Sequence, residues 1–310
     1  MAAMALASIR SHHLKHASGL NLPLSGRGRS FASFGEIVQG RLSTGEDFLV
    51  TLPIELWSKC RLSVQPRNSQ HQIITPWPKA RQLAELLLDK LASQESLSVT
   101  LEFDRNIPVG KGLSSSTADL LAIIRSFQMA FQFTMSQAET SKLLVQIEAH
   151  DPLHYDNCVV YNHRQGQLLN TLHYTPNYHI IGIDQGGELS SEAYNANLQY
   201  GYSDLQQYDA LYQALLTAFE RQDDLAIAHC ATQSAMLHAK RTHNIFLNEV
   251  LAYSEQHPAV MGVVATHSGT CAGLLIVANC PQPLSNTIAN EASQFGHIFE
   301  TRTLRRAKSD

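Results

Sequence analysis

The fold of this chain is decided by the stretch Ile107-Pro108-Val109-Gly110-Lys111-Gly112-Leu113-Ser114-Ser115-Ser116-Thr117-Ala118-Asp119. Before it, residues 97–103 have β-strand composition, and after it residues 118–124 have the apolar spacing of a helix. The hydroxyl side chains at the junction can cap the helix, and the two glycines allow backbone N–H groups to converge. The stretch is therefore predicted to be a strand, a tight loop and a helix N-terminus.

Such a junction favours an anion, because free backbone amides and the helix dipole both attract negative charge, and Lys111 adds a mobile cation. We therefore expect a phosphate group at this loop, although a capped helix after a strand also occurs without a ligand. The Walker pattern does not fit, since no Gly-Lys-Ser/Thr closes a six-residue glycine loop. Gly35 and Gly40 have that glycine spacing, but Arg41-Leu42 follow them.

The loop resembles the phosphate-loop signature of the GHMP kinases, a superfamily of small-molecule kinases, which reads Pro-x-x-x-Gly-Leu-x-Ser-Ser-Ala/Thr. Within that superfamily, Lys-Gly-x-x-Ser-Ser-Thr-Ala-Asp looks most like the bacterial L-threonine kinases of cobalamin side-chain synthesis. The resemblance implies an α+β fold with two lobes: an N-terminal ribosomal S5 domain 2-like lobe with the phosphate loop, and a C-terminal ferredoxin-like lobe. It assigns ATP to Pro108, Gly110, Lys111, Gly112, Leu113, Ser114, Ser115, Ser116 and Thr117.

The composition is that of an ordinary globular protein. The 310 residues are 44% apolar and 16% charged, with a formal net charge of −4, and this balance offers no basic field for nucleic acid. No apolar run approaches the roughly 18 residues of a bilayer-crossing helix. The 5 cysteines are far apart and include no Cys-x-x-Cys pair, which fits a reducing cytoplasm. We expect neither a nucleic-acid nor a membrane partner, and a homodimer is one option for assembly.

The chain is long enough for two modest domains. Its first thirty or so residues lack acidic side chains, as a transit peptide would, but a disordered tail over 1–30 is the preferred interpretation. The expected domains are an N-terminal GHMP kinase ATP-binding domain over 31–200 and a C-terminal GHMP kinase domain over 201–303. A basic tail is expected over 304–310.

Apolar periodicity predicts further elements on both sides of the loop. A β-hairpin is expected from 31–41 and 48–64, in a mixed sheet with helices on one side. One amphipathic helix is expected over 80–91 and another over 136–148, where Ser136 and Glu139 can form a capping box. The other expected elements are a strand-turn-strand unit over 157–172, a strand over 178–183, helices over 203–221, 223–240 and 245–257, and strands over 260–266 and 274–277.

The first strand of the expected hairpin carries Gly35-Glu36-Ile37-Val38-Gln39-Gly40. This Gly-Glu-x-x-Gln-Gly pattern resembles the beginning of the threonine kinases, and the resemblance implies that Glu36 and Gln39 lie in the substrate pocket. From the residues alone, a solvent-facing strand position is the commoner role for such a glutamate.

A second polar cluster follows the helix expected over 136–148: Glu148-Ala149-His150-Asp151-Pro152-Leu153-His154-Tyr155-Asp156-Asn157. Two of its histidines have the i,i+4 spacing of zinc ligands. However, Pro152 interrupts a helix there and no His-Glu-x-x-His is present, so a zinc site is disfavoured. Phosphoryl transfer accounts for the acids better, because Mg²⁺ prefers oxygen ligands and transfer to an alcohol benefits from a nearby carboxylate.

The resemblance also implies roles within this cluster. Glu-x-x-Asp of the threonine kinases matches Glu148 and Asp151, which implies Mg²⁺ held by Ser116 and Glu148, Asp151 as the base, and Lys111 on the triphosphate. A competing register remains, because His154-Tyr155-Asp156-Asn157 resembles the His-x-Asp-Asn of homoserine kinases. In homoserine kinases this segment lies at the substrate and no dedicated base is required. This register would place Asp156 and Asn157 beside the substrate. Asp151 is preferred, although Ala149-His150 stand where the threonine kinases usually show Pro-Thr.

A third segment of small residues, His267-Ser268-Gly269-Thr270-Cys271-Ala272-Gly273, separates two apolar strands. It resembles the third glycine-rich motif of GHMP kinases, which packs beside the phosphate loop, and the resemblance implies substrate contacts from His267, Ser268, Gly269 and Thr270. A plain hairpin turn explains the same residues without a ligand. Asp184-Gln185-Gly186-Gly187 also resembles the threonine kinases, although a Gly-Gly turn that ends a strand explains it nearly as well. A serine hydrolase is not supported, because Gly-x-Ser-x-Gly fails at Thr266.

Together the three motifs imply an ATP- and Mg²⁺-dependent kinase that phosphorylates the hydroxyl of a small amino acid. L-threonine is the first expected substrate, and homoserine or another amino alcohol is the alternative within the superfamily. A catalytically silent nucleotide-binding regulator on the same fold is the alternative from a different class, because a fold does not guarantee chemistry.

Overall fold

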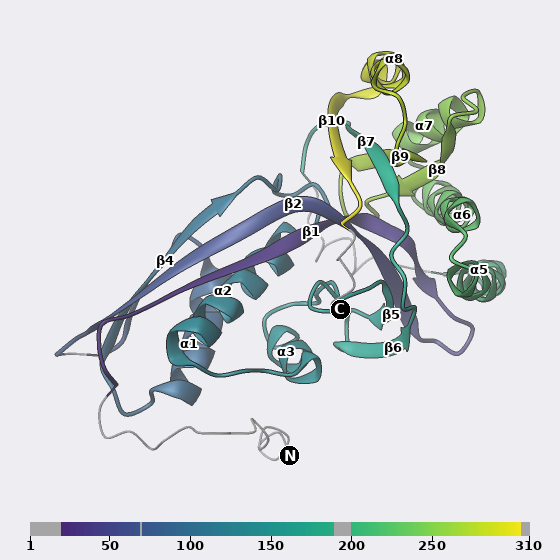
Figure 1. The fold of residues 1–310 in the computed structure, drawn as a ribbon. Coiled ribbons are helices and arrows are strands. Elements are labelled where there is room, and N and C mark those ends of the chain that lie inside the picture. Colours follow the sequence, from purple (N-terminus) through teal and green to yellow (C-terminus); the bar gives the residue numbers. More distant parts are fainter. Residues whose placement is uncertain (1–19, 69, 189–199, 305–310) are drawn as a thin grey trace. The chain divides into compact units, whose positions relative to one another are not determined.

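The computed structural model describes residues 20–68, 70–188 and 200–304 (Figure 1). The chain forms two compact units. Unit 1 contains the residues up to Ser30, Trp57–Asn106 and Ser116–Ala149, and unit 2 contains Phe31–Leu56, Ile107–Ser115 and the residues from His150 onward. The α+β class expected from the sequence is confirmed. The expected domain bounds of 31–200 and 201–303 remain a prediction.

The predicted hairpin forms from two long strands, β1 (Leu24–Arg41) and β2 (Asp47–Pro66), and each strand contributes to both units. Its turn is closed by the Arg41 guanidinium, whose Nε donates to Asp47 Oδ1 at 2.8 Å. β1 starts at Leu24, so the expectation of a tail over 1–30 is wrong from Leu24 onward. A close contact explains the difference. A Cβ at Gly26 would lie 2.0 Å from the Ser126 carbonyl oxygen, so glycine lets the strand lie against helix α2. Residues 1–19 lie outside the described residues.

In unit 1, helices cover one face of a sheet (Figure 1). Strand β4 (Leu97–Arg105) pairs antiparallel with Ser58–Pro66 of β2, and the short β3 (Gln72–Ile74) pairs parallel with β4. The predicted helices are α1 (Pro78–Leu91), α2 (Ser115–Phe131) and α3 (Gln137–Leu144).

Helix α3 is shorter than predicted. The capping box of Ser136 and Glu139 is present, but the helix ends at Leu144 and not at Glu148. The Leu144 carbonyl oxygen accepts from Ile147 N at 2.8 Å, a tight turn that replaces the next helical turn before Pro152.

Unit 2 is built on an antiparallel sheet in the order β10-β7-β9-β8-β1-β2. The strands β7 (Tyr178–Asp184), β8 (Val260–Ala265) and β9 (Cys271–Val277) were expected, as was the hairpin of β5 (Val159–Asn162) and β6 (Gln167–Thr171), in which β5 pairs with β2. β10 (His297–Arg302) and α8 (Gln282–Ala292) were not predicted, because both are short and rich in polar residues.

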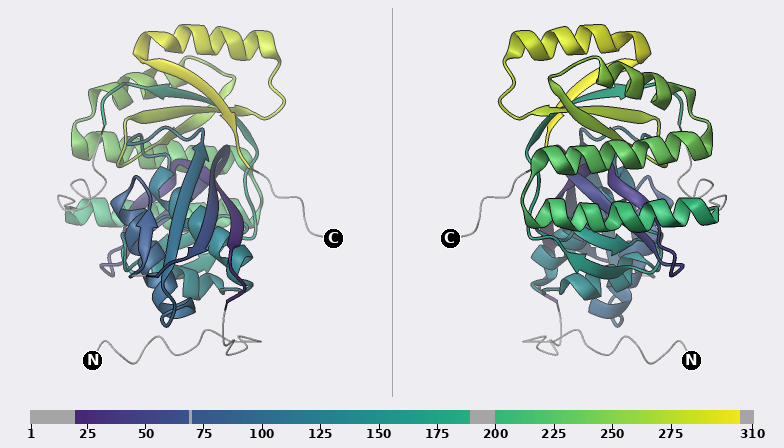
Figure 2. Two further views of the ribbon diagram at one scale, coloured as in Figure 1. Left: turned by 90° about the vertical axis from the view of Figure 1, so that its left-hand side faces the viewer. Right: turned by 90° about the vertical axis from the view of Figure 1, so that its right-hand side faces the viewer.

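The core of unit 2 lies between this sheet and its helices. The expected helices α5 (Tyr202–Glu220), α6 (Asp224–Thr242) and α7 (Ile245–Glu255) are present, and a 3-10 turn, Ser293–Phe295, follows α8. In Figure 2, α5 and α6 lie side by side as two long helices. Ala235, Val250 and Ile288 pack against strand residues such as Val263 and Leu274. Among the described residues, no helix has both the length and the apolar character that crossing a bilayer requires.

Candidate active site

The phosphate-loop stretch has the predicted shape. Ile107 and Leu113 are buried and fix its ends in unit 2, while the residues between them form a turn with positive φ at Gly110 (71°) and Gly112 (76°). Ser114 also has a positive φ, 58°, which is unusual for a residue with a side chain. Helix α2 begins directly afterwards, at Ser115, so the predicted sequence of loop and helix N-terminus is confirmed.

The third motif packs against this loop inside unit 2, as the resemblance implied. A Cβ on Gly269 would lie 2.1 Å from the Lys111 carbonyl oxygen, and a Cβ on Gly112 would lie 2.6 Å from Thr266 Cβ. The turn itself is held by Gly269 N, which donates to Thr266 O at 3.0 Å. Glycine is required on both sides, because any side chain would force the two backbones apart.

Lys111 is held by the last residue of β7 and by the segment that follows it. Its ammonium lies 2.8 Å from Asp184 Oδ2 and donates to the Gly187 carbonyl oxygen at 2.6 Å. Asp184 Oδ1 accepts from Thr270 Oγ1 at 2.7 Å, which links the lysine to the third motif. Partial burial alone would raise the pKa of Asp184, but hydrogen bonds from Lys111, Thr270 and Gly186 hold it below 3.8. Sequence reasoning gave Asp184 no role, and its only signal was the Asp-x-Gly-Gly pattern.

Asp151, the predicted base, is hydrogen-bonded to the phosphate-loop stretch within unit 2. Ser114 Oγ donates to Asp151 Oδ2 at 2.6 Å. The Ser114 hydroxyl in turn contacts the hydroxyl of Ser33, a fully buried residue of β1. Ser33 was missed by sequence reasoning, because a serine inside an apolar strand carries no motif of its own.

The predicted substrate residues of the first and third motifs meet inside unit 2. Glu36 Oε2 accepts from the His267 backbone N at 3.2 Å and lies 3.0 Å from His267 Nδ1. On the other side of the ring, His267 Nε2 lies 3.3 Å from Ser234 Oγ, which accepts from Gln39 N at 3.3 Å. The ring of His238 packs against that of His267, with the ring centroids 4.6 Å apart and the planes tilted by 56°. Ser234 and His238 lie on helix α6, and sequence reasoning missed both because the contacts span long sequence separations.

Burial determines the charge of this group. Removal from water raises the pKa of Glu36, against the opposing effect of the His267 backbone bond, and it lowers the pKa of both His267 and His238. The cluster therefore favours an uncharged carboxyl beside neutral imidazoles when no ligand is bound.

Unit 1 contains the predicted metal ligands. Ser116 and Thr117 lie in the first turn of α2, and Glu148 follows the turn after α3. The Glu148 carboxylate lies 2.5 Å from the Lys79 ammonium at the start of α1, an ion pair that the sequence did not predict. Within the described ranges, no group of three or more His, Cys, Asp and Glu residues is arranged to hold a metal ion by protein atoms alone.

The first turn of α2 is anchored by a buried acid in unit 1. Asp119 accepts from Ser58 Oγ at 2.5 Å and from the Arg105 guanidinium at 2.6 Å. Burial nevertheless raises the pKa of this carboxyl above 3.8, although both donors oppose the shift. These bonds fix the orientation of the helix start on the sheet.

The alternative substrate segment has a different environment. Asp156 and Asn157 are exposed, whereas His150 and His154 are buried among tyrosine rings. His150 Nε2 lies 2.7 Å from the hydroxyl of Tyr161 on β5. Both histidines therefore have aromatic packing partners.

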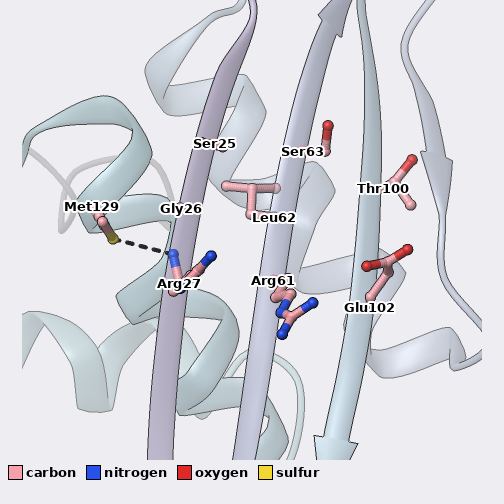
Figure 3. A pocket seen from close by; sticks show the side chains of 9 residues that line it. All are labelled: Ser25, Gly26, Arg27, Arg61, Leu62, Ser63, Thr100, Glu102 and Met129. Carbon is pink, nitrogen blue, oxygen red and sulfur yellow. Dashed lines mark hydrogen bonds between the residues drawn. The ribbon is translucent and has the colours of Figure 1, made fainter.

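A cavity of about 690 Å³ in unit 1 contains none of the predicted site residues (Figure 3). It lies on the sheet, where Arg27 of β1, Arg61 of β2 and Glu102 of β4 project as neighbours. The predicted site and this cavity therefore share no residues.

Comparisons with known proteins agree with these motifs. Residues 79–162 match the model of the GHMP kinases N terminal domain. The chain is similar to the L-threonine kinase of Citrobacter freundii, with 23% identity over 256 residues, 80% of this chain and 85% of the relative. It is similar at the same identity to the L-threonine kinase of Salmonella typhimurium strain LT2, over 79% of this chain and 81% of the relative.

Among solved structures, the chain is similar to homoserine kinase from Cytophaga hutchinsonii. The TM-score is 0.68 at 11% identity, and the match covers 93% of this chain and 97% of the other. This likeness confirms the two-lobed GHMP kinase fold that the phosphate loop implied. The chain therefore has the fold of the GHMP kinases, and its residues 79–162 match the N-terminal domain of that family.

Proposed function

We propose that this protein is an ATP-dependent phosphotransferase that phosphorylates the side-chain hydroxyl of a small amino acid, with L-threonine as the substrate and O-phospho-L-threonine as the product. The observation that carries the proposal is the hydrogen bond between Ser114 and Asp151, because it joins a carboxylate to the end of a loop shaped for phosphate. Two relatives named L-threonine kinase support the choice of acceptor. A role in cobalamin side-chain synthesis is proposed only if L-threonine is the acceptor.

In this proposal the loop holds the triphosphate. The turns at Gly110 and Gly112 bring backbone close to a ligand, and the α2 N-terminus adds donors at Ser115 and Ser116. The Lys111 ammonium would contact the phosphates, with or without breaking its ion pair with Asp184, and neutralise the negative charge that develops on them.

Mg²⁺ fits the oxygen donors of unit 1. Glu148 provides a largely buried carboxylate that already attracts a cation, Lys79, and Ser116 provides a hydroxyl. Mg²⁺ is usually bound by one or two carboxylates together with substrate phosphates and water, so a cage of three protein acids is not needed. When bound, the ion would neutralise charge on the β- and γ-phosphates.

Asp151 is proposed to act on the acceptor. The Asp151 carboxylate, oriented by the hydrogen bond from Ser114, would accept the proton of the substrate hydroxyl. The substrate oxygen forms a bond to the γ-phosphorus as the bond from that phosphorus to the bridging oxygen breaks, and ADP leaves. Glu36 and His267 are proposed to face the amino-acid part of the substrate.

Two carboxylate variants test the base. With the purified full chain, ATP and L-threonine, Asp151→Asn should lower kcat by roughly 100-fold or more, because general base catalysis contributes that much. Its affinity for ATP should stay within about two-fold of wild type, since asparagine keeps the size of the side chain and its place beside Ser114. The competing register predicts the reverse pattern, with the loss in Asp156→Asn and wild-type turnover in Asp151→Asn.

The acceptor is tested in the same assay. L-threonine, L-serine, L-homoserine and ethanolamine are compared as acceptors, and threonine should give the highest kcat/KM. A preference for homoserine would move the assignment within the superfamily. ATP binding without turnover on any acceptor would instead indicate the catalytically silent regulator.

A further inference from the structure

We infer that Ser33 and Ser114 form a hydroxyl relay that orients Asp151 and tunes its proton affinity, so that both serines are positioning residues for phosphoryl transfer. The inference deepens the proposed function and rests on Asp151 as the base. Neither serine is one of the positions that define the superfamily signature, and the resemblance places Ser114 only within the nucleotide loop.

The backbone at Ser114 gives the first reason. Its φ of 58° is a conformation that glycine adopts easily and that costs a residue with a side chain of the order of 1 kcal/mol. A serine at such a position is best explained by its hydroxyl group. That hydroxyl makes two contacts, one with Asp151 and one with Ser33, and both lie inside unit 2.

The direction of the hydrogen bonds gives the second reason. Ser114 donates its only hydroxyl proton to Asp151 Oδ2, so its contact with Ser33 requires Ser33 to be the donor. The chain of donors therefore runs from Ser33 to Ser114 to Asp151. A carboxylate that accepts a hydrogen bond is stabilised in its charged form, which is the form that a base needs.

The burial of Ser33 gives the third reason. It is fully buried in β1, between Ala32 and Phe34, which are themselves buried. A buried hydroxyl is costly unless it forms a hydrogen bond, and Ser114 is a partner that offsets this cost for Ser33. If this bond served only to satisfy the hydroxyl, Ser33→Ala would leave kcat unchanged. Glu36 lies three residues further along the same strand, so β1 would contribute to both the base and the substrate pocket.

Three variants of the full chain test the relay: Ser33→Ala, Ser114→Gly and the double variant. Ser114→Gly removes the hydroxyl and relieves the strained backbone, so it should fold at least as well as wild type. It should lower kcat by roughly 10-fold, as expected for the loss of one hydrogen bond of about 1.4 kcal/mol to a charged group. The acidic limb of the kcat–pH profile should move to higher pH, because the carboxylate has lost a donor.

Ser33→Ala should lower kcat by a smaller factor, roughly 3-fold, with the same direction of shift in the acidic limb. The double variant should be no worse than Ser114→Gly alone, because Ser33 acts only through Ser114. The matched control is Ser285→Ala, another fully buried serine of unit 2, on helix α8, which should keep the wild-type profile.

The outcomes separate the inference from the proposed function. If Asp151→Asn is inactive while Ser114→Gly keeps the wild-type kcat and acidic limb, the relay is wrong and the base assignment stands. Additive losses in the double variant would also overturn the relay, because they would show that Ser33 acts independently. If Asp151→Asn retains wild-type turnover, the base assignment fails and the relay fails with it.

Discussion

The contact between Glu36 and His267 shows how burial sets charge at a single position. Two groups that would be ionised or easily protonated in water lie 3.0 Å apart and are both buried. Burial favours the neutral form of each, which raises the pKa of the carboxyl and lowers that of the imidazole. An ammonium group from an amino-acid substrate would reverse this preference and favour the carboxylate.

This contact predicts a pH dependence of stability. Above pH 4.5 the unfolded chain releases the Glu36 proton, whereas the folded protein keeps it up to a pKa of about 8. The folded state therefore loses stability relative to the unfolded chain as pH rises from 4.5 through the folded pKa. His267 acts in the opposite direction and destabilises the protein as pH falls below 6.5. Urea unfolding of wild type and Glu36→Gln should therefore show wild type losing stability relative to the variant between pH 4.5 and about pH 8.

The exposed glutamate Glu102 on β4 is the matched control, and Glu102→Gln should give no such trend. Parallel stability curves for wild type and Glu36→Gln would show that the buried carboxyl is ionised in the folded state, against this prediction.

Gly269 gives a second prediction at the residue scale. A methyl group there would collide with the Lys111 carbonyl oxygen at 2.1 Å, so Gly269→Ala should separate the third motif from the phosphate loop. We expect a raised KM for ATP, by roughly 10-fold or more, and a lower Tm, because the shift costs on the order of 1–3 kcal/mol. Gly201→Ala, at the N-cap of α5 where the nearest described atom to a Cβ is Asp204 Oδ2 at 3.5 Å, should leave the KM for ATP unchanged.

At the scale of elements, helix α3 depends on its N-terminal capping box. Ser136 Oγ accepts from Glu139 N at 3.2 Å, and Glu139 Oε2 accepts from Ser136 N at 2.7 Å. Ser136→Ala should lower the free energy of unfolding by about 1 kcal/mol, and Glu139→Ala should lower it by a similar or smaller amount. Chemical denaturation measures both, and an unchanged midpoint for Ser136→Ala would contradict the role of the cap.

Much of this element-level structure was predictable from the sequence. The phosphate-loop stretch, the hairpin and helices α5 to α7 follow from glycine, capping residues and apolar spacing, which act over a few residues. β10 and α8 were missed because their sequences are polar and short, so their stability depends on the core of unit 2. The start of β1 was missed because composition suggested a tail, while the decisive contact of Gly26 is with α2, far along the chain.

The site was predictable to a smaller extent. Motifs identified Glu36, Lys111, Asp151 and the third motif, and the structure joins these in unit 2 through hydrogen bonds and backbone contact. Ser33 and Ser234, which hold them, have no local pattern, and Asp184 has only the Asp-x-Gly-Gly pattern, because each acts across a long separation in sequence.

At the scale of the whole molecule, the proposed nucleotide should stabilise the fold. A ligand that binds only the folded state at about 100 times its Kd adds roughly 2.7 kcal/mol, so ATP with Mg²⁺ should raise Tm measurably. Lys111→Met should reduce this shift, since it removes the charge that the proposal places on the phosphates and leaves Asp184 without its cation. Lys59→Met, which removes an exposed lysine paired with Asp104, should leave the ATP-induced shift intact.

The central claim is that a carboxylate bonded to the phosphate loop directs phosphoryl transfer to an amino-acid hydroxyl. The most direct test is to incubate the purified protein with ATP, Mg²⁺ and L-threonine and to identify the products by phosphorus NMR. The account predicts ADP and an O-phosphorylated threonine in equal amounts, and neither product above background with Asp151→Asn. Release of inorganic phosphate without any phosphorylated amino acid, or full activity in Asp151→Asn, would contradict it.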